Sequence, residues 1–338
     1  MHKYLTLPGL AFGIFRSKFM DEENIPQLSG KIASDIRKGY TGGATDMYIP
    51  KGKNIKSYDV NSLYPSAMFK NDMPIGSPTY FEGDIRKIDP NAFGFFYVRI
   101  TAPDNLKHPI LQTHVNTGDG IRTISPIGVW EDMIFSPEMD NAVKYGYKFE
   151  ILWGYTFEKG NIFKNYVDFL YLLRLTYPKT DVMNFIAKIL LNSLYGRFGM
   201  DDNFNNAKVL HKNLATKYEL AHLDELIEII ELENHKIIFT KTIDENNEKE
   251  HNVSIAVAAA ISSYSRIHMT QFKNNPKINL YYTDTDSVYT DSEINENLIS
   301  DIVLGALKLE NVCKKAIFLG SKSYCLELSN GKLITKIK

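Results

Sequence analysis

Three aspartates occupy positions at which carboxylates could hold divalent cations. Asp59 ends a run of alternating polar and β-prone residues, and Pro65 follows soon after, which predicts a strand that ends in a tight turn. Asp284 and Asp286 lie between two further β-prone runs, which predicts a hairpin with both carboxylates at its tip. Because residues two apart in a strand face the same way, we expect this pair to lie together.

Three carboxylates within a few ångströms would repel one another unless cations neutralised them. Mg²⁺ and Mn²⁺ prefer oxygen ligands, and two such ions about 3.5–4 Å apart are typical of sites that transfer phosphoryl groups. The order Asp-Thr-Asp is also ordinary turn chemistry, because both residue types are common in turns. On these residues alone, both interpretations of Asp284 and Asp286 stay open.

A second set of polar residues follows helical spacing. Lys188, Asn192 and Tyr195 stand at i, i+4 and i+7, so they share one face of a predicted helix. A lysine can neutralise a phosphate, an asparagine can bond a sugar or phosphate, and a tyrosine can stack on a base. The alternative is the solvated face of an amphipathic helix. The residues expected to face the core are Val182, Phe185, Ile186, Ile189 and Leu190.

The surrounding elements must position these two sets. Residues 79–157, rich in aromatic, β-branched, glycine and proline residues, predict several short strands, and residues 161–177 have the apolar spacing of a helix. Residues 201–253 contain 12 Asp and Glu against 6 Lys, which is typical of a peripheral subdomain. Residues 254–272 predict a packed helix, in which we expect Arg266 to have a structural hydrogen-bonding role.

Five short motifs, taken in order, resemble those of family B DNA polymerases. They are YTGG at residues 40–43 (family pattern YxGG), DVNSLYPS at 59–66 (DxxSLYPS), KILLNSLYG at 188–196 (KxxxNSxYG), YTDTDS at 282–287 (YxDTDS) and KSY at 322–324 (KxY). The resemblance extends over about residues 1–328 and is greatest to the protein-primed branch of small bacteriophages and of linear plasmids in fungal and plant mitochondria.

The resemblance implies an α+β fold: a right-hand polymerase palm and fingers with an antiparallel palm sheet, two insertions and a largely missing thumb. The implied domains are 1–39, a remnant of the exonuclease–polymerase connection; 40–78, the template-binding loop and palm with the first motif; 79–157, the first insertion, similar to terminal-protein region 1; 158–200, the fingers with the second motif; 201–253, the second insertion, similar to terminal-protein region 2; and 254–338, the palm with the third motif and the KxY strand.

The N-terminal segment departs from the family. Before Tyr40 the acidic run Asp21-Glu22-Glu23 consists of adjacent residues, whereas a 3′–5′ exonuclease needs separated carboxylates. We therefore expect no proofreading in this chain, and we expect the chain to be the middle of a larger polymerase.

The resemblance also assigns catalytic roles. It implies that Asp59 and Asp286 are shared ligands of two Mg²⁺ ions, with the Val60 carbonyl oxygen as a further ligand. Asp284 would be a supporting catalytic carboxylate.

A nucleotide-binding set follows from the same resemblance. Its members are the backbone N–H groups of Ser62, Leu63 and Tyr64 and the side chains of Lys179, Lys188, Asn192 and Tyr195. Tyr64 would also exclude a 2′-OH and so select deoxynucleotides. Arg174 is the alternative to Lys179 for contact with the triphosphate, and Lys179 is preferred because it is next to the cap of the motif helix.

The implied DNA contacts come from both ends of the chain. Tyr40, Gly42 and Gly43 would bind the template strand through backbone N–H groups, because glycine permits a close approach. Lys322 and Tyr324, on one face of a strand, would steady the primer terminus.

The implied activity is that of a DNA-directed DNA polymerase, which adds deoxynucleotides to a 3′-OH, or to a hydroxyl of a terminal protein at initiation. Expected partners are template DNA, a primer terminus, dNTPs and a terminal protein, with no membrane. The expected location is the mitochondrion, otherwise a virus or the cytoplasm. Two alternatives remain: a truncated, inactive DNA-binding remnant, and a metal-dependent nuclease that uses the same carboxylates.

Composition excludes several other classes. The 338 residues carry a net charge of −1 and contain two cysteines, so neither a disulfide framework nor a cysteine zinc cage is expected. No apolar run has the length of a membrane span. The neutral charge gives no support to nucleic-acid binding, but residues 201–253 carry −6, which leaves +5 on the rest.

Overall fold

The computed structural model of the chain describes residues 6–20, 25–118, 120–200, 205–241 and 254–337. The acidic run Asp21-Glu22-Glu23 lies outside them. The chain divides into two compact units, Met1–Gly199 with Ser254–Lys338, and Met200–Val253. Among the described residues, no helix has the length and apolar character needed to cross a lipid bilayer.

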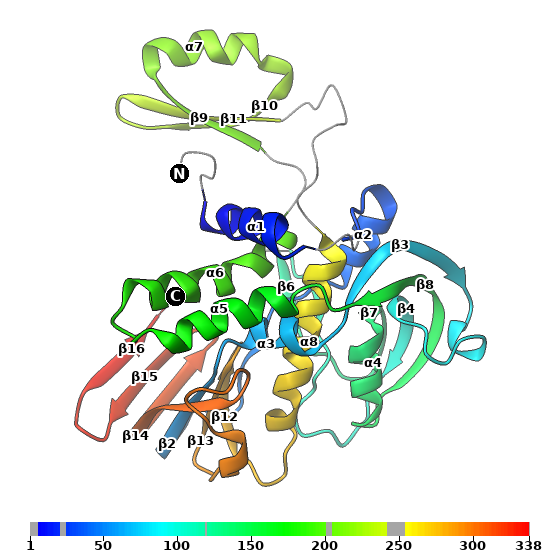
Figure 1. The fold of residues 1–338 in the computed structure, drawn as a ribbon, viewed down its shortest axis with the longest axis vertical. Helices are drawn as coiled ribbons and strands as arrows, with labels where there is room; N and C mark the ends of the chain where they lie inside the picture. Colours follow the sequence, from blue (N-terminus) through cyan, green and yellow to red (C-terminus); the bar gives the residue numbers. More distant parts are fainter. Residues whose placement is uncertain (1–5, 21–24, 119, 201–204, 242–253, 338) are drawn as a thin grey trace. The chain divides into compact units, whose positions relative to one another are not determined.

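The larger unit is built on a seven-stranded sheet in the order β1-β12-β13-β2-β14-β15-β16, in which every neighbouring pair is antiparallel (Figure 1). The strands are β1 (Thr45–Met47), β2 (Lys51–Val60), β12 (Leu280–Asp284), β13 (Ser287–Thr290), β14 (Leu307–Gly320), β15 (Ser323–Leu328) and β16 (Leu333–Lys336), with a short helix η3 (Glu296–Leu298) before β14. The early strand β2 therefore lies between two late strands. The α+β fold with an antiparallel palm sheet is confirmed.

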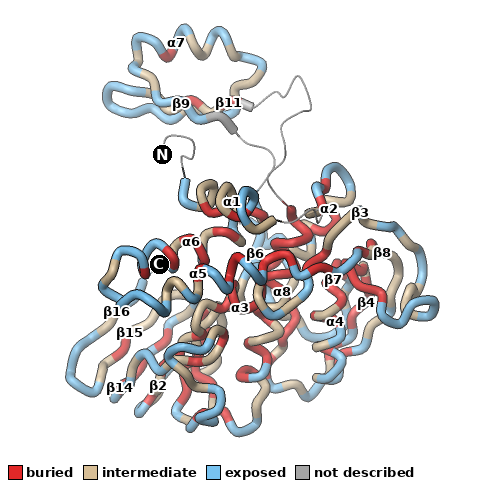
Figure 2. Tube along the Cα trace, in the orientation of Figure 1, coloured by how far each residue is buried: buried red, intermediate tan, exposed pale blue. Residues whose placement is uncertain are grey.

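Two helices pack against this sheet. They are α3 (Leu63–Lys70), directly after β2, and α8 (Ile255–Lys273). Val60 and Leu63 share a buried apolar cluster with Met269 and Phe272 of α8. The helix predicted at 254–272 is confirmed, and Figure 2 shows that much of its course is buried. Its alanines and serines are small, so neighbouring elements approach it closely from several sides.

The first insertion is a second, smaller sheet. Its strands have the order β3-β8-β4-β7, and a separate hairpin pairs β5 with β6. The elements are β3 (Met73–Glu82), η1 (Ile85–Lys87), β4 (Gly94–Thr101), β5 (Thr113–Asn116), β6 (Ile121–Ile124), β7 (Val129–Phe135), α4 (Ser136–Val143) and β8 (Lys148–Gly160). Met73 pairs with Gly160, so this sheet extends beyond the predicted 79–157 at both ends.

Helices at the N-terminus and in the fingers region share one core. They are α1 (Leu7–Lys18), α2 (Gly30–Lys38), α5 (Lys164–Thr176) and α6 (Val182–Phe198). Phe15 of α1 packs against Phe163, Tyr166 and Phe198 with ring centroids 5.1–6.3 Å apart. This cluster joins the N-terminal helix to both fingers helices.

The predicted core face of α6 is wrong in its first two turns. Val182, Phe185 and Ile186 are 69%, 59% and 41% exposed, and the buried face instead includes Leu191 and Leu194. The helix is apolar on two opposite faces, so periodicity alone did not distinguish the face that packs. Leu190, also predicted to be buried, is buried.

The smaller unit is a three-stranded antiparallel sheet with one helix. Its strands have the order β10-β11-β9. The elements are β9 (Asn205–His211), α7 (Lys212–Ala221), η2 (Leu223–Glu225), β10 (Leu226–Glu231) and β11 (His235–Lys241). Ala215 of α7 and Ile238 of β11 are fully buried, so the unit has a small core of its own.

Candidate functional site

The end of β2 and the β12–β13 turn bring two carboxylates together. Asp59 pairs in register with Ser287, and the Val60 N–H donates to the Asp286 carbonyl oxygen at 2.8 Å. Thr285 has a left-handed backbone, with φ of 61°, and makes the two-residue turn with Asp286. Asp286 thus lies in the turn itself beside the end of β2.

Asp59 and Asp286 each have a raised pKa, so the charged form of each carboxylate is disfavoured. Burial is the largest cause that raises the pKa of Asp59, and repulsion from Asp286 and Glu310 adds to it. The pKa of Asp286 is also raised, chiefly by burial. A cation between these groups would relieve both effects.

Asp284 does not join the pair, contrary to the expectation of three clustered carboxylates. Its carboxylate accepts hydrogen bonds from Lys322 Nζ at 2.5 Å, Lys336 Nζ at 3.2 Å and Thr45 Oγ1 at 3.1 Å. Burial acts to raise the pKa of Asp284, but the two lysines hold it below its usual value. Strand periodicity does not apply here, because Asp286 is in the turn. Among the described residues, no three carboxylate, histidine or cysteine side chains form a metal-binding group.

A cleft of about 560 Å³ contains most of the predicted site. It is lined by Asp59, Val60, Asn61, Ser62, Leu63, Tyr64, Arg174, Lys179, Lys188, Asn192, Tyr195, Asp286, Asp301, Lys308 and Glu310. The three residues of the α6 stripe therefore face the carboxylate pair across one opening. Sequence reasoning missed Asp301, Lys308 and Glu310. Lys308 lies opposite Asp59 in the β14–β2 pairing, and no local pattern indicates that register.

The turn after β2 is held in a specific shape. Ser62 has a left-handed backbone, with φ of 53°, and precedes α3. Its hydroxyl accepts a hydrogen bond from Arg174 Nη1 at 2.8 Å. Arg174 and Lys179 both line the cleft, so the structure does not decide between these two candidates for contact with the triphosphate.

Tyr64 and Tyr195 stack on each other within the cleft. Their ring centroids are 3.9 Å apart and the ring planes differ by 16°. Burial raises the pKa of Tyr64, so its hydroxyl stays protonated. A stacked pair of rings fills space next to the carboxylates and restricts what can bind there.

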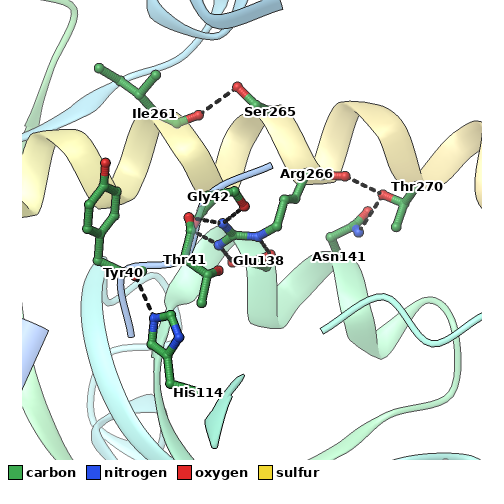
Figure 3. Close-up of polar contacts among 11 residues, drawn as sticks. Tyr40, Thr41, Gly42, His114, Glu138, Asn141, Ile261, Ser265, Arg266 and Thr270 are labelled. Carbon is green, nitrogen blue, oxygen red and sulfur yellow. Dashed lines mark hydrogen bonds and ion pairs between the residues drawn. The ribbon is translucent and has the colours of Figure 1, made fainter. Parts of the chain in front are cut away.

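The glycine-rich loop lies beside the hairpin turn. A Cβ at Gly43 would lie 2.4 Å from the Thr285 methyl carbon, so only glycine fits this close approach. A Cβ at Gly42 would meet nothing within 4 Å, so that side of the loop is open. Arg266 is buried and bonds this loop, as its predicted structural role requires (Figure 3).

Lys322 and Tyr324 were predicted to share one face of a strand, but the structure does not place both of them in a strand. Lys322 precedes β15 and has φ of 55°, so it belongs to a turn. Its N–H donates to the Tyr282 hydroxyl at 2.8 Å, and its Nζ reaches Asp284. Tyr324 packs against the ring of Tyr282 at 5.7 Å. Both residues therefore contact β12, the strand that leads to the turn at Thr285 and Asp286.

Comparisons with known proteins agree with these features. The family described as DNA polymerase type B, organellar and viral, matches residues 1–279. A probable DNA polymerase of Ascobolus immersus is 42% identical over 95% of this chain, and one of Neurospora intermedia is 38% identical over 99%. The DNA polymerase of Bacillus phage Nf is 28% identical over 93% of the chain. The chain spans only 27%, 35% and 53% of these relatives' lengths.

Solved structures show the same fold. The phi29 DNA polymerase aligns with a TM-score of 0.74 and 21% identity, over 98% of this chain and 58% of that one. Its complex with primer-template DNA and incoming nucleotide aligns with a TM-score of 0.73 and 19% identity, over 99% of this chain and 60% of that one. By fold and by sequence, the chain belongs to the organellar and viral family of type B DNA polymerases.

Proposed function

We propose that this chain contains the nucleotidyl-transfer centre of a DNA-directed DNA polymerase. One arrangement supports the proposal: Asp59 and Asp286 face Lys188, Asn192 and Tyr195 across a single cleft. Carboxylates suit metal-assisted phosphoryl transfer, and the helix stripe suits a nucleotide with its triphosphate. Because hydrolysis needs no nucleotide-selecting residues, this combination favours a polymerase over a nuclease.

The oxygen donors at the end of β2 fit Mg²⁺ or Mn²⁺. Asp59 and Asp286 would hold the ions, with the Val60 carbonyl as a neutral ligand, and their raised pKa values are what a neighbouring cation would reverse. When bound, two such ions lower the pKa of a primer 3′-OH and stabilise the pyrophosphate that leaves.

The chain's own residues would hold and select the nucleotide. Backbone N–H groups of the turn at Ser62 would bind the triphosphate, and Arg174 would fix that turn through its hydrogen bond to Ser62. Lys188 and Lys179 would neutralise the phosphates from the helix side. The Tyr64 ring would occupy the space that a ribose 2′-OH needs.

The DNA strands would be held on either side of the catalytic turn. Tyr40, Gly42 and Gly43 would bind the template strand, and Lys322 with Tyr324 would bind the primer end. Asp284 would then act by fixing Lys322 rather than as a metal ligand.

Primer extension tests the central proposal. The 338-residue chain should add dNTPs to a primed template with Mg²⁺, and Asp286→Asn should lower the rate by several orders of magnitude. Absence of incorporation by the unaltered chain would leave the inactive remnant as the better description. Degradation of the DNA without incorporation would favour the nuclease.

We further propose initiation on a protein hydroxyl and a role in copying a linear plasmid or viral DNA in a mitochondrion or virus. The support is the similarity of the chain to DNA polymerases of fungi and bacteriophages, together with motifs that resemble the protein-primed branch. Incubation with [α-³²P]dATP and extracts of the host should label a protein. If no protein is labelled, whichever radioactive dNTP is supplied, the proposal of protein priming is wrong.

A further inference from the structure

Three consecutive carbonyl oxygens of the glycine-rich loop are bound by the protein (Figure 3). Arg266 Nη1 donates to the Thr41 oxygen at 2.6 Å and to the Gly42 oxygen at 3.1 Å. The Tyr40 oxygen lies 3.0 Å from His114 Nε2. Because a carbonyl only accepts, His114 Nε2 carries the proton, and its Nδ1 accepts from Thr123 Oγ1 at 3.2 Å.

The N–H groups of the same loop have no such partners. Within the described part of the chain, the N–H groups of Thr41, Gly42 and Gly43 donate to no protein acceptor. The open space beside Gly42 lies next to them. Successive N–H groups left unpaired beside open space are the usual way in which a backbone binds anions such as phosphate.

Arg266 does not itself present a charge to DNA. It is buried, and Glu138 of α4 accepts from its Nε at 2.7 Å and from its Nη2 at 2.6 Å. This bidentate pair neutralises the guanidinium and fixes its plane, so that Nη1 points at the loop. Asn141 of the same helix α4 also bonds Thr270 of α8 at 3.1 Å, which fixes the two helices to each other.

Glu138, which bonds Arg266, and His114, which bonds Tyr40, both come from the first insertion. We infer that they are positioning residues of the template-binding loop: Glu138 orients Arg266, His114 holds Tyr40, and the loop's N–H groups are thereby turned toward template phosphates. The first insertion then helps to bind the template through its contacts with Tyr40 and Arg266. This inference rests on the proposed function for the ligand, but the loop geometry stands independently of activity.

Two measurements on the full chain test the inference without requiring polymerisation. Order parameters from ¹⁵N relaxation report the backbone order of residues 40–43 in the absence of DNA. Fluorescence anisotropy with a fluorescein-labelled primer–template duplex reports DNA affinity. His114 is exposed, so His114→Ala should fold normally, and Val115→Ala on the same strand is the matched control.

We expect His114→Ala to lower the backbone order parameters of residues 40–43 and to weaken DNA binding by about threefold to tenfold, as loss of one hydrogen bond predicts. Glu138→Gln should have a larger effect. His114→Gln should restore both values, because its amide can donate to the Tyr40 oxygen. In primer extension, the KM for primer–template should rise, whereas a smaller folded fraction would lower the apparent kcat and leave this KM unchanged.

The outcomes distinguish the positioning role of Glu138 and His114 from the proposed polymerase function. If His114→Ala matches Val115→Ala in the order parameters of residues 40–43 and in DNA affinity, the positioning role is wrong although the chain binds DNA. If Glu138→Gln fails to fold, the His114 series still decides. If the unaltered chain binds no primer–template DNA, the proposed function fails, and the template role fails with it.

Discussion

Tyr64 lies flat against Tyr195 in the cleft, and this contact limits how far its ring can move. A ring held from one side is a firm obstacle to a 2′-OH on the other. Tyr64→Ala should reduce discrimination against ribonucleotides by roughly 10–200-fold. Single-nucleotide incorporation kinetics with dCTP and CTP measure it. Tyr64→Phe should keep the discrimination, and equal discrimination by Tyr64→Ala would contradict the assignment.

The partners of Asp284 predict a defect in primer binding. Asp284→Asn should weaken primer–template affinity through Lys322, and the Mg²⁺ concentration for half-maximal activity should stay unchanged. Lys322→Ala should weaken binding similarly, and the double variant should be no worse than either single one, because the two residues act as a pair. A higher Mg²⁺ requirement in Asp284→Asn would show instead that it is a metal ligand.

The raised pKa of Asp59 predicts how stability depends on pH in the absence of metal. The ordinary value is 3.8 and the folded value is about 7, so between these pH values the folded chain keeps a proton that the unfolded chain releases. The free energy of unfolding should therefore fall as pH rises from 4 to 7. Urea denaturation with EDTA measures it, and Asp59→Asn should flatten the dependence. An unchanged slope in Asp59→Asn would contradict the raised pKa of Asp59, which burial and the neighbouring carboxylates cause.

At the scale of elements, α6 combines a buried face, a polar cleft face and an exposed apolar face. Leu191 is fully buried, whereas Phe185 is 59% exposed. Leu191→Ala should cost about 2–5 kcal/mol of unfolding free energy, and Phe185→Ala less than about 1 kcal/mol. Chemical denaturation compares the two. Similar losses would mean that Phe185 packs against protein in solution.

Local spacing was enough to predict the elements but not their partners. The stripe of Lys188, Asn192 and Tyr195 was predictable because helical periodicity acts over a few residues. The separation of Asp284 from Asp286 was not, because Asp286 lies in the turn and Asp284 is bound by Lys322 and Lys336, which are distant in sequence. The role of Glu138 was equally hidden, since nothing near it in sequence indicates Arg266.

At the scale of the molecule, the near-neutral charge is the sum of two unlike units. The acidic segment lies in the unit Met200–Val253, and the ends of the larger unit that flank it are already close. The Ser254 N–H donates to the Phe198 carbonyl oxygen at 3.0 Å. The larger unit therefore does not need the smaller one to join Phe198 to Ser254.

Replacement of residues 200–253 by a short glycine linker should leave the larger unit folded. Because α6 and α8 keep their contacts, its melting temperature should change by less than about 3 °C. Circular dichroism and thermal melting measure this. A control variant that lacks the β5–β6 hairpin should keep its melting temperature but bind DNA more weakly. Loss of cooperative unfolding in the linker variant would contradict the independence of the two units.

The position of β2 between β13 and β14 also sets the order of events during synthesis. Asp59 emerges from the ribosome more than 200 residues before its neighbours Ser287 and Lys308. Pairings between such distant segments form slowly, because the intervening chain must first be closed into a loop. The nascent protein must therefore keep an unpaired β2 from aggregating until β13 and β14 have been synthesised. We expect its yield in a cell to depend on chaperones that shield exposed strand edges.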